Sequence, residues 1–335
     1  MKVLVTGGTG FVGSAVVRAL LTRNLSVRAL VRPGSDRSNL HALPVEIAVG
    51  DLCDGASLER AVRGCRAIFH VAADYRLWTR DPNRMYRTNV EGTETLLRLA
   101  LAAGVERFIY TSSVATLGAD PAGAVTDETT PVDLDDMVGH YHRSKFLAEQ
   151  KVRAVAAAGA RIVIVHPSMP LGPRDLKPTP TGRAVANAVS GKIPAYVDTG
   201  LNIVHVDDVA EGHVLALERG RPGENYILGG ENMTLRRLLS LIAEARGRRP
   251  RFIRLPHLAV VPVAYAAEAW AVLTGGEPLP SREEVQMARR YMYFSSARAI
   301  ERLGYRPRPA FEAVHEAVAW FTRQEPMRRP ALANA

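Results

Sequence analysis

Tyr141 and Lys145 lie four residues apart in a segment whose pattern predicts a helix. This spacing places both side chains on one face of such a helix. Free tyrosine has a pKa of about 10, which is too high for efficient proton exchange at neutral pH. A lysine ammonium one turn away favours the phenolate and lowers this pKa, so the pair can act as an acid and a base. Because such pairs also occur by chance in ordinary helices, the pair needs support from other motifs.

A glycine-rich turn follows the first predicted strand and opens the first predicted helix. It satisfies both G-x-G-x-x-G (Gly8, Gly10, Gly13) and G-x-x-G-x-x-G (Gly7, Gly10, Gly13). Glycines there allow backbone to approach a pyrophosphate, and the helix start offers N–H donors. An ordinary glycine-rich turn is the alternative, but the position in the first βα unit favours dinucleotide binding. The predicted contacts are Gly7, Gly10, Phe11, Val12 and Gly13.

The end of the second predicted strand favours NADP(H) over NAD(H). An NAD site usually places a carboxylate about 20 residues beyond the glycines, to hold the ribose hydroxyls. Arg32 occupies that place here, and no carboxylate precedes Asp36. A guanidinium can hydrogen-bond a 2′-phosphate, and Ser35 can add a hydroxyl donor. A solvated Arg32 is the alternative, and Asp51-Leu52 is expected to flank the adenine.

Two serines follow another predicted strand, in Tyr110-Thr111-Ser112-Ser113. Open α/β sheets bind their ligands at the carboxyl ends of strands. A serine hydroxyl there can hydrogen-bond a substrate oxygen while a tyrosine moves the proton and a nicotinamide moves the hydride. Taken alone, the two serines also fit simple turn chemistry.

Nearly continuous apolar runs, separated by helical patterns, predict the strands and helices that position these residues. This alternation is typical of a parallel sheet covered on both faces, and so of a Rossmann-type, doubly wound α/β fold. The predicted strands are Val3–Thr6, Ser26–Val31, Val45–Val49, Ala67–Val71, Phe108–Thr111 and Ile162–Val165, and the helices are Phe11–Arg23, Ala56–Arg63, Asn83–Ala103 and Tyr141–Ala157.

The second half of the chain predicts a smaller, mainly helical C-terminal substrate domain, with helices at Thr234–Arg246, Ser281–Tyr291 and Pro309–Phe321. Strand-like segments at Asn202–Val206 and Asn225–Leu228 suggest returns to the first domain. We therefore expect an NAD(P)-binding domain at 1–167 with returns at about 202–229. The cap is expected at 168–201 and 230–325, and a frayed tail at 326–335.

Composition excludes several classes of protein. The chain of 335 residues is 47% hydrophobic and 23% charged, as ordinary globular proteins are. Two cysteines cannot form a disulfide framework or a four-ligand zinc site, and no metal site is predicted. The expected strand at the start leaves no room for a signal peptide, so a cytoplasmic location is expected. The net charge of +9 suits anionic ligands, but no nucleic-acid-binding motif accompanies it.

Together these motifs resemble the extended short-chain dehydrogenase/reductase superfamily, which includes sugar epimerase/dehydratases and dihydroflavonol-reductase-like enzymes. Three segments, Thr126–Pro131, Gly172–Gly182 and Val204–Val209, look closer still to the hopanoid-associated sugar epimerase proteins. Members of the superfamily commonly form dimers through the helices that begin here near Asn83 and Tyr141, so the resemblance implies a homodimer.

The resemblance also implies roles for single residues. Tyr141 would be the proton donor and acceptor, Lys145 its electrostatic partner and ribose anchor, and Ser113 the donor to the substrate oxygen, with Ser112 as the neighbouring choice. Asn89 would stabilise the region of the active-site helix. Tyr141 and Lys145 would also contact the cofactor, and the remaining implied cofactor contacts are Ala72, Ala73, Pro167 and Ser168.

The family resemblance and the cofactor argument favour different reactions. Epimerases of this superfamily typically keep NAD bound and return the hydride, whereas Arg32 favours NADPH and net carbonyl reduction. An NADP(H)-dependent reductase of a small substrate is therefore placed slightly ahead of a sugar epimerase. A non-catalytic dinucleotide sensor is the alternative of another class, but sensors often lose the tyrosine or the lysine.

Three charged segments each allow more than one role. Arg174, Lys177 and Arg183 can clamp a phosphate or carboxylate, or be solvated loop charges. His205 beside two carboxylates invites a metal interpretation, but Asp207 or Asp208 is expected to cap a helix instead. The basic run at Arg246–Arg251 and the apolar run that follows can contact an anionic membrane surface. A solvated turn before a helix that lines the substrate pocket is favoured over that contact.

Overall fold

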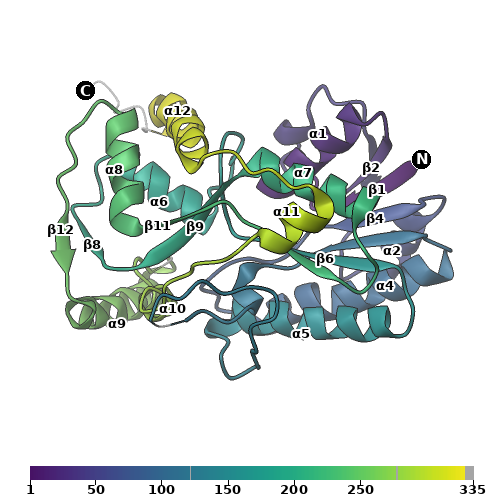
Figure 1. Cartoon of the computed structure of the whole chain (residues 1–335), viewed down its shortest axis with the longest axis horizontal. Helices are drawn as coiled ribbons and strands as arrows, with labels where there is room; N and C mark the ends of the chain where they lie inside the picture. The colour runs from purple at the N-terminus through teal and green to yellow at the C-terminus, as the bar shows by residue number, and fades with distance from the viewer. Residues whose placement is uncertain (121, 277, 329–335) are drawn as a thin grey trace.

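The computed structural model describes residues 1–120, 122–276 and 278–328. Parallel strands form its seven-stranded sheet in the order β10-β6-β5-β4-β1-β2-β3. Figure 1 shows this sheet in the right-hand half of the molecule. The central strands are buried on both faces, which explains their continuous apolar runs. These strands are β1 Lys2–Thr6, β2 Ser26–Val31, β3 Glu46–Val49, β4 Ala67–His70, β5 Arg107–Thr111, β6 Ile162–Pro167 and β10 Asn225–Leu228.

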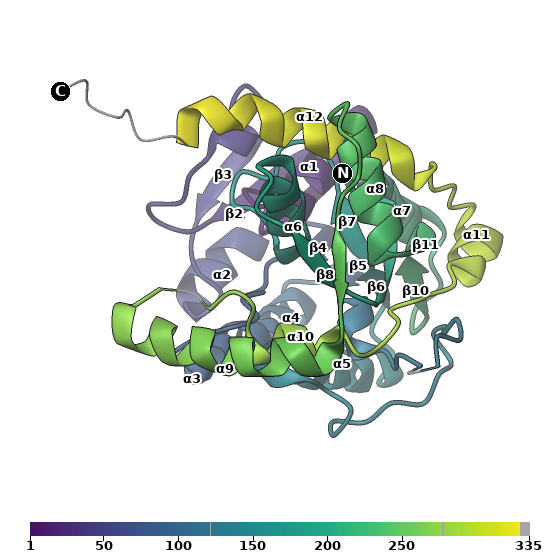
Figure 2. The ribbon, with the colours of Figure 1, turned by 90° about the vertical axis from the view of Figure 1, so that its left-hand side faces the viewer.

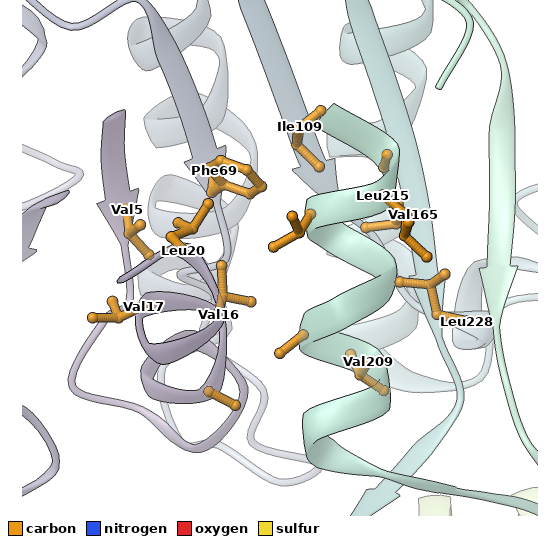
Figure 3. Close-up of a cluster of buried hydrophobic side chains, with 14 of the residues drawn as sticks. Val5, Val16, Val17, Leu20, Phe69, Ile109, Val165, Val209, Leu215 and Leu228 are labelled. Atoms are coloured by element: carbon orange, nitrogen blue, oxygen red, sulfur yellow. The ribbon is translucent and has the colours of Figure 1, made fainter. Parts of the chain in front are cut away.

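Alternate side chains of each strand belong to two different cores. On β1, Val3 and Val5 belong to a core cluster that includes Val16 and Val209 of one helix layer. Figure 3 labels Val5, Val16 and Val209 of this cluster. Leu4 points to the opposite face and joins the other layer. The first layer consists of α1 Phe11–Thr22 and α7 Val206–Arg219, and the second of α2 Gly55–Val62, α4 Gly92–Ala102 and α5 Gly139–Ala157. This is the predicted Rossmann-type fold.

The predicted helix Asn83–Ala103 forms one helical run with a π-helical turn inside it. It consists of α3 Pro82–Tyr86, the π-helical turn η2 Arg87–Glu91 and then α4, with no break between them. Such π turns are frequent at functional sites, and this one carries Asn89, whose contacts are described below. Two short 3₁₀ segments complete this half, η1 Ser38–Leu40 and η3 Val114–Thr116.

The cap has its own core and two small sheets besides its helices. One sheet has the order β11-β9-β7 and the other pairs β12 with β8. The strands are β7 Met169–Leu171, β8 Ala195–Val197, β9 Gly200–His205, β11 Glu231–Thr234 and β12 Ile253–Leu255. The helices are α6 Pro180–Val189, α8 Leu235–Ala245, α9 His257–Thr274, α10 Arg282–Met287 and α12 Ala310–Arg328, while α11 Ala297–Leu303 packs against α7.

Two expectations for the second half need correction. The segment predicted to return at Asn202–Val206 forms β9, which pairs with β7 and β11 rather than with the large sheet. The return is made by α7 and by β10, which pairs with β6. In addition, the helix α12 extends to Arg328 into the predicted tail 326–335, whose residues from 329 on lie outside the described residues.

A partly buried carboxyl group joins the cap to the helix that carries Tyr141. Glu283 of α10 accepts a hydrogen bond from the backbone N–H of His140 in the first turn of α5. Gly139 allows this approach, because a Cβ there would lie 2.1 Å from the carboxyl carbon of Glu283. Burial raises the pKa of Glu283 to about 7, against the smaller lowering effect of the His140 hydrogen bond.

This raised pKa predicts that stability falls as pH rises. Below about pH 4.5 the Glu283 carboxyl is protonated in both the folded and the unfolded protein, so its burial costs no stability. As pH rises to about 7, the carboxyl ionises more readily in the unfolded protein, and the free energy of unfolding falls. Since the group is partly exposed, we expect wild type to lose roughly 1–2 kcal/mol of unfolding free energy relative to Glu283→Gln between pH 5 and 8. Urea unfolding at both pH values measures this difference. The exposed Glu301→Gln is the control, and equal pH dependence of wild type and Glu283→Gln would contradict the prediction.

Candidate active site

A cleft of about 1120 Å³ lies between the carboxyl ends of the large sheet and the cap. It is lined by segments that follow β1, β2, β3, β4, β5 and β6, as an open α/β sheet requires. Every residue predicted for the site lines this cleft: Gly7, Gly10, Phe11, Val12, Gly13, Arg32, Asp51, Leu52, Ala72, Ala73, Ser113, Tyr141, Lys145, Pro167 and Ser168.

The glycine turn has no room for side chains. A Cβ at Gly13 would lie 2.1 Å from the carbonyl oxygen of Gly7, and a Cβ at Gly7 would lie 2.8 Å from the backbone nitrogen of Ala72. Gly8 is absent from the described cleft lining and faces Ala29 in the core instead. The G-x-x-G-x-x-G pattern therefore describes the cleft-facing glycines. No side chain caps the start of α1 at Gly10, so its first N–H groups are available for an anion.

Arg32 lies exposed at the edge of the cleft, near the second strand's carboxyl end. No carboxylate of the described residues forms an ion pair with it. Asp36 also lines the cleft, and its carboxylate accepts hydrogen bonds from the backbone and hydroxyl of Ser38. Asn39, which the sequence did not indicate, closes this end by donating to the carbonyl oxygens of Thr9 and Arg174, both at 3.2 Å.

Tyr141 and Ser113 face each other in the cleft. Burial raises the pKa of Tyr141, and its hydrogen bond with Ser113 lowers it in part. The Ser113 hydroxyl also accepts from the backbone N–H of Ala115 at 3.1 Å. The neighbouring Ser112 is buried and donates to Glu149 at 2.5 Å. Of the two serines, Ser113 is thus the one whose hydroxyl meets the tyrosine.

Lys145 interacts with the sheet rather than with Tyr141. Its Nζ donates to the carbonyl oxygen of Thr111 at 2.8 Å and to Tyr110 Oη at 3.0 Å. Burial lowers the pKa of Lys145 to about 7, and Glu149 opposes this shift. The expected lowering of the Tyr141 pKa by Lys145 is therefore not present in this structure. The reason is that the buried ammonium group donates its hydrogen bonds to Tyr110 and Thr111 at the end of β5.

A buried polar cluster behind the cleft was missed by sequence reasoning. Burial alone would raise the pKa of Glu149, but His166 and Arg153 together with two hydroxyl groups lower it. One hydroxyl is that of Ser112 and the other that of Thr116, at 2.8 Å. The available signal was the spacing along α5, because Tyr141, Lys145, Glu149 and Arg153 follow one another at intervals of four residues.

Asn89 connects the segment after β4 to the active-site helix by direct hydrogen bonds. Its side chain accepts from the backbone N–H of Asp74 at 2.7 Å and donates to the carbonyl oxygen of the same residue at 2.9 Å. It also donates to Ser144 Oγ on α5 at 2.9 Å. These contacts fix the cleft wall that begins at Ala73 relative to Tyr141.

Most of the charged residues considered above form ion pairs or hydrogen bonds within the protein. Arg174 pairs with Asp207 and Arg183 with Glu284, so only Lys177 of the proposed clamp lines the cleft as described. The predicted cap of α7 is also wrong: the side chain of His205 accepts from the backbone N–H of Asp207. No cluster of three metal-ligating side chains occurs among the described residues.

The cleft lining also includes apolar and aromatic side chains that sequence reasoning did not identify. They are Tyr75, Leu77, Val114, Met287 and Met292. The apolar run after Arg254, expected to line this pocket, does not do so in the described structure. It forms α9, none of whose residues lines the cleft.

A family model described as the NAD dependent epimerase/dehydratase family matches residues 3–229. A putative dihydroflavonol 4-reductase of Synechocystis sp. is 42% identical, and the match covers 95% of this chain and 93% of the relative. Among solved structures, gox2253 is 52% identical with a TM-score of 0.87, covering 97% of this chain and 98% of that one. The UDP-glucose 4-epimerase of Thermus thermophilus, in complex with NAD, is 27% identical with a TM-score of 0.78, covering 96% and 99%.

The family match extends over well over half of the chain and includes the glycine turn, both serines, Tyr141 and Lys145. The fold and the order of the motifs agree with it. This chain therefore belongs to the NAD-dependent epimerase/dehydratase family of enzymes, within the extended short-chain dehydrogenase/reductase superfamily.

Proposed function

We propose that this protein is an NADP(H)-dependent reductase that transfers a hydride to the carbonyl carbon of a small substrate. The choice of cofactor rests on Arg32. Its side chain is exposed at the cleft edge and has no carboxylate partner among the described residues. A guanidinium in this place favours a 2′-phosphate. The similarity to a putative dihydroflavonol 4-reductase supports a reductase.

The side chains at the end of β5 and on α5 suit protonation of a carbonyl oxygen. NADPH, when bound, supplies the hydride. Ser113 would orient the substrate oxygen by a hydrogen bond, and Tyr141 would donate its phenolic proton to the same oxygen. Lys145 would donate hydrogen bonds to the ribose hydroxyls while its ammonium group stays hydrogen-bonded to the carbonyl oxygen of Thr111. The apolar side chains of the cleft lining would exclude water and contact the rest of the substrate.

The second candidate is an epimerase, favoured by the similarity to a UDP-glucose 4-epimerase in complex with NAD. Both reactions use the same serine, tyrosine and lysine. They differ in whether the dinucleotide is consumed. A reductase oxidises one NADPH for each product molecule, whereas an epimerase turns over without net oxidation of the cofactor.

Arg32 is the residue that tests the choice of cofactor. We expect Arg32→Ala to weaken NADPH binding about 10- to 100-fold, because charge-assisted hydrogen bonds to the 2′-phosphate are lost. NADH binding should change less than about threefold, because NADH has no such phosphate. Fluorescence titration measures both affinities. Arg37→Ala, an exposed arginine outside the described cleft lining, is the matched control. Equal losses for NADPH and NADH in Arg32→Ala would reject the assignment.

Tyr141 is the residue that tests the assignment of the proton donor. Tyr141→Phe should lower kcat about 10²- to 10⁴-fold, since general acid catalysis contributes that much. NADPH affinity should stay within about twofold if only the proton is lost. A panel of ketones, aldehydes and dihydroflavonols, followed by NADPH oxidation, supplies the assay. Tyr196→Phe, on β8 and outside the described cleft lining, is the control. If Tyr141→Phe retained full kcat, another group would be the acid.

A further inference from the structure

The helix α9 exposes an apolar surface that the rest of the described chain does not cover. Only Ala264 and Ala271 of its 18 residues are buried. Leu258 is 78% exposed, Trp270 68% and Leu273 81%. α9 is also the one helix of the described structure whose length and apolar composition would allow it to cross a membrane.

The exposed side chains of α9 form a continuous face to which the helix itself contributes no charged group, while the guanidinium of Arg282 from α10 lies over the Tyr265 ring, 5.1 Å from its centroid. Leu258, Pro262, Tyr265, Ala269 and Leu273 recur at intervals of three and four residues and lie on one side of the helix. At 1.5 Å per residue the face from Leu258 to Leu273 is about 23 Å long. Glu268, the single ionisable carboxylate in the helix, is mostly buried in an ion pair with Arg282 of α10. Continuous apolar surfaces of this kind mark sites of interaction.

A strongly basic segment lies on the same side of the molecule. Residues 246–254 contain five arginines and no acidic residue. Arg248, Arg249 and Arg251 are exposed and have no ion-pair partner among the described residues. Figure 2 shows the chain passing from α8 through β12 to α9 on the face turned toward the viewer. Ile253 of β12 adds an exposed apolar side chain between the basic segment and the helix.

We propose that this face binds the surface of an anionic lipid bilayer, with α9 lying in the plane of the interface. The arginines would contact lipid phosphates, and the apolar side chains would enter the acyl boundary. Tyr265 and Trp270 are the residue types preferred at this depth.

The contacts of α9 favour a helix that lies on the bilayer over one that spans it. Arg80 donates to the carbonyl oxygens of Ala271 and Val272 near the end of the helix, at 2.9 and 3.1 Å. The Glu268–Arg282 pair and the contacts with α10 hold the helix along the cap. A spanning helix would have to break these bonds. A second copy of the chain fits less well, since it would bring another basic segment to the same side.

Flotation with vesicles tests this proposal with the full-length protein. We expect binding to vesicles of phosphatidylcholine mixed with phosphatidylglycerol, weakened by salt, and little binding to phosphatidylcholine alone. Leu258→Glu/Leu273→Glu and, separately, Arg248→Glu/Arg249→Glu/Arg251→Glu should each reduce the bound fraction at least about tenfold. Ile300→Glu/Phe311→Glu, two exposed apolar residues on α11 and α12, should not. Thermal unfolding verifies that all variants remain folded.

Several results would overturn the proposal. These are no flotation of wild type, equal binding to neutral and anionic vesicles, or equal losses in the control variant. Light scattering adds a further outcome: if Leu258→Glu/Leu273→Glu dissociates a dimer and wild type does not float, a second copy covers the face. A blue shift of tryptophan emission on anionic vesicles, abolished by Trp270→Phe, would support the proposed depth of α9.

Discussion

The buried hydrogen bonds between Lys145 and the carboxyl end of β5 fix the active-site helix α5 relative to the large sheet, and the rest of the site depends on this contact. An ammonium group buried to this extent is costly, and burial lowers the pKa of Lys145 to about 7. The carbonyl oxygen of Thr111 and the phenol of Tyr110 compensate part of this cost. Because Lys145 lies one turn beyond Tyr141, fixing the lysine against the sheet also fixes the tyrosine above the cleft.

Further contacts repeat this attachment at other points of α5. Glu149 accepts hydrogen bonds from the hydroxyl groups of Ser112 and Thr116, and Asn89 of η2 donates to Ser144. At the first turn of the helix, Glu283 brings the cap against His140. Hence the wall of the cleft, the end of β5 and the cap all meet on one helix, which explains how residues distant in sequence keep a common geometry.

Periodicity and motif position predicted the sheet, its flanking helices and the residues that line the cleft, because these depend on local pattern and on the topology of parallel strands. Long-range pairing was less predictable. The strand at Gly200–His205 has the apolar pattern of a central strand, yet it pairs with β7 and β11 in the cap. The i, i+4 spacing brought Lys145 near Tyr141, but it could not show that Tyr110 and Thr111 offer better acceptors. The cluster around Glu149 depends on His166, and the two residues are brought together only by the packed fold.

A crystal structure of the protein with NADP⁺ tests the central claim most directly, since it locates both ends of the cofactor at once. The account predicts the 2′-phosphate beside Arg32, the pyrophosphate on the Gly7–Gly13 turn, and the nicotinamide next to Ser113 and Tyr141. A 2′-phosphate directed away from Arg32, or a nicotinamide remote from Tyr141, would contradict it.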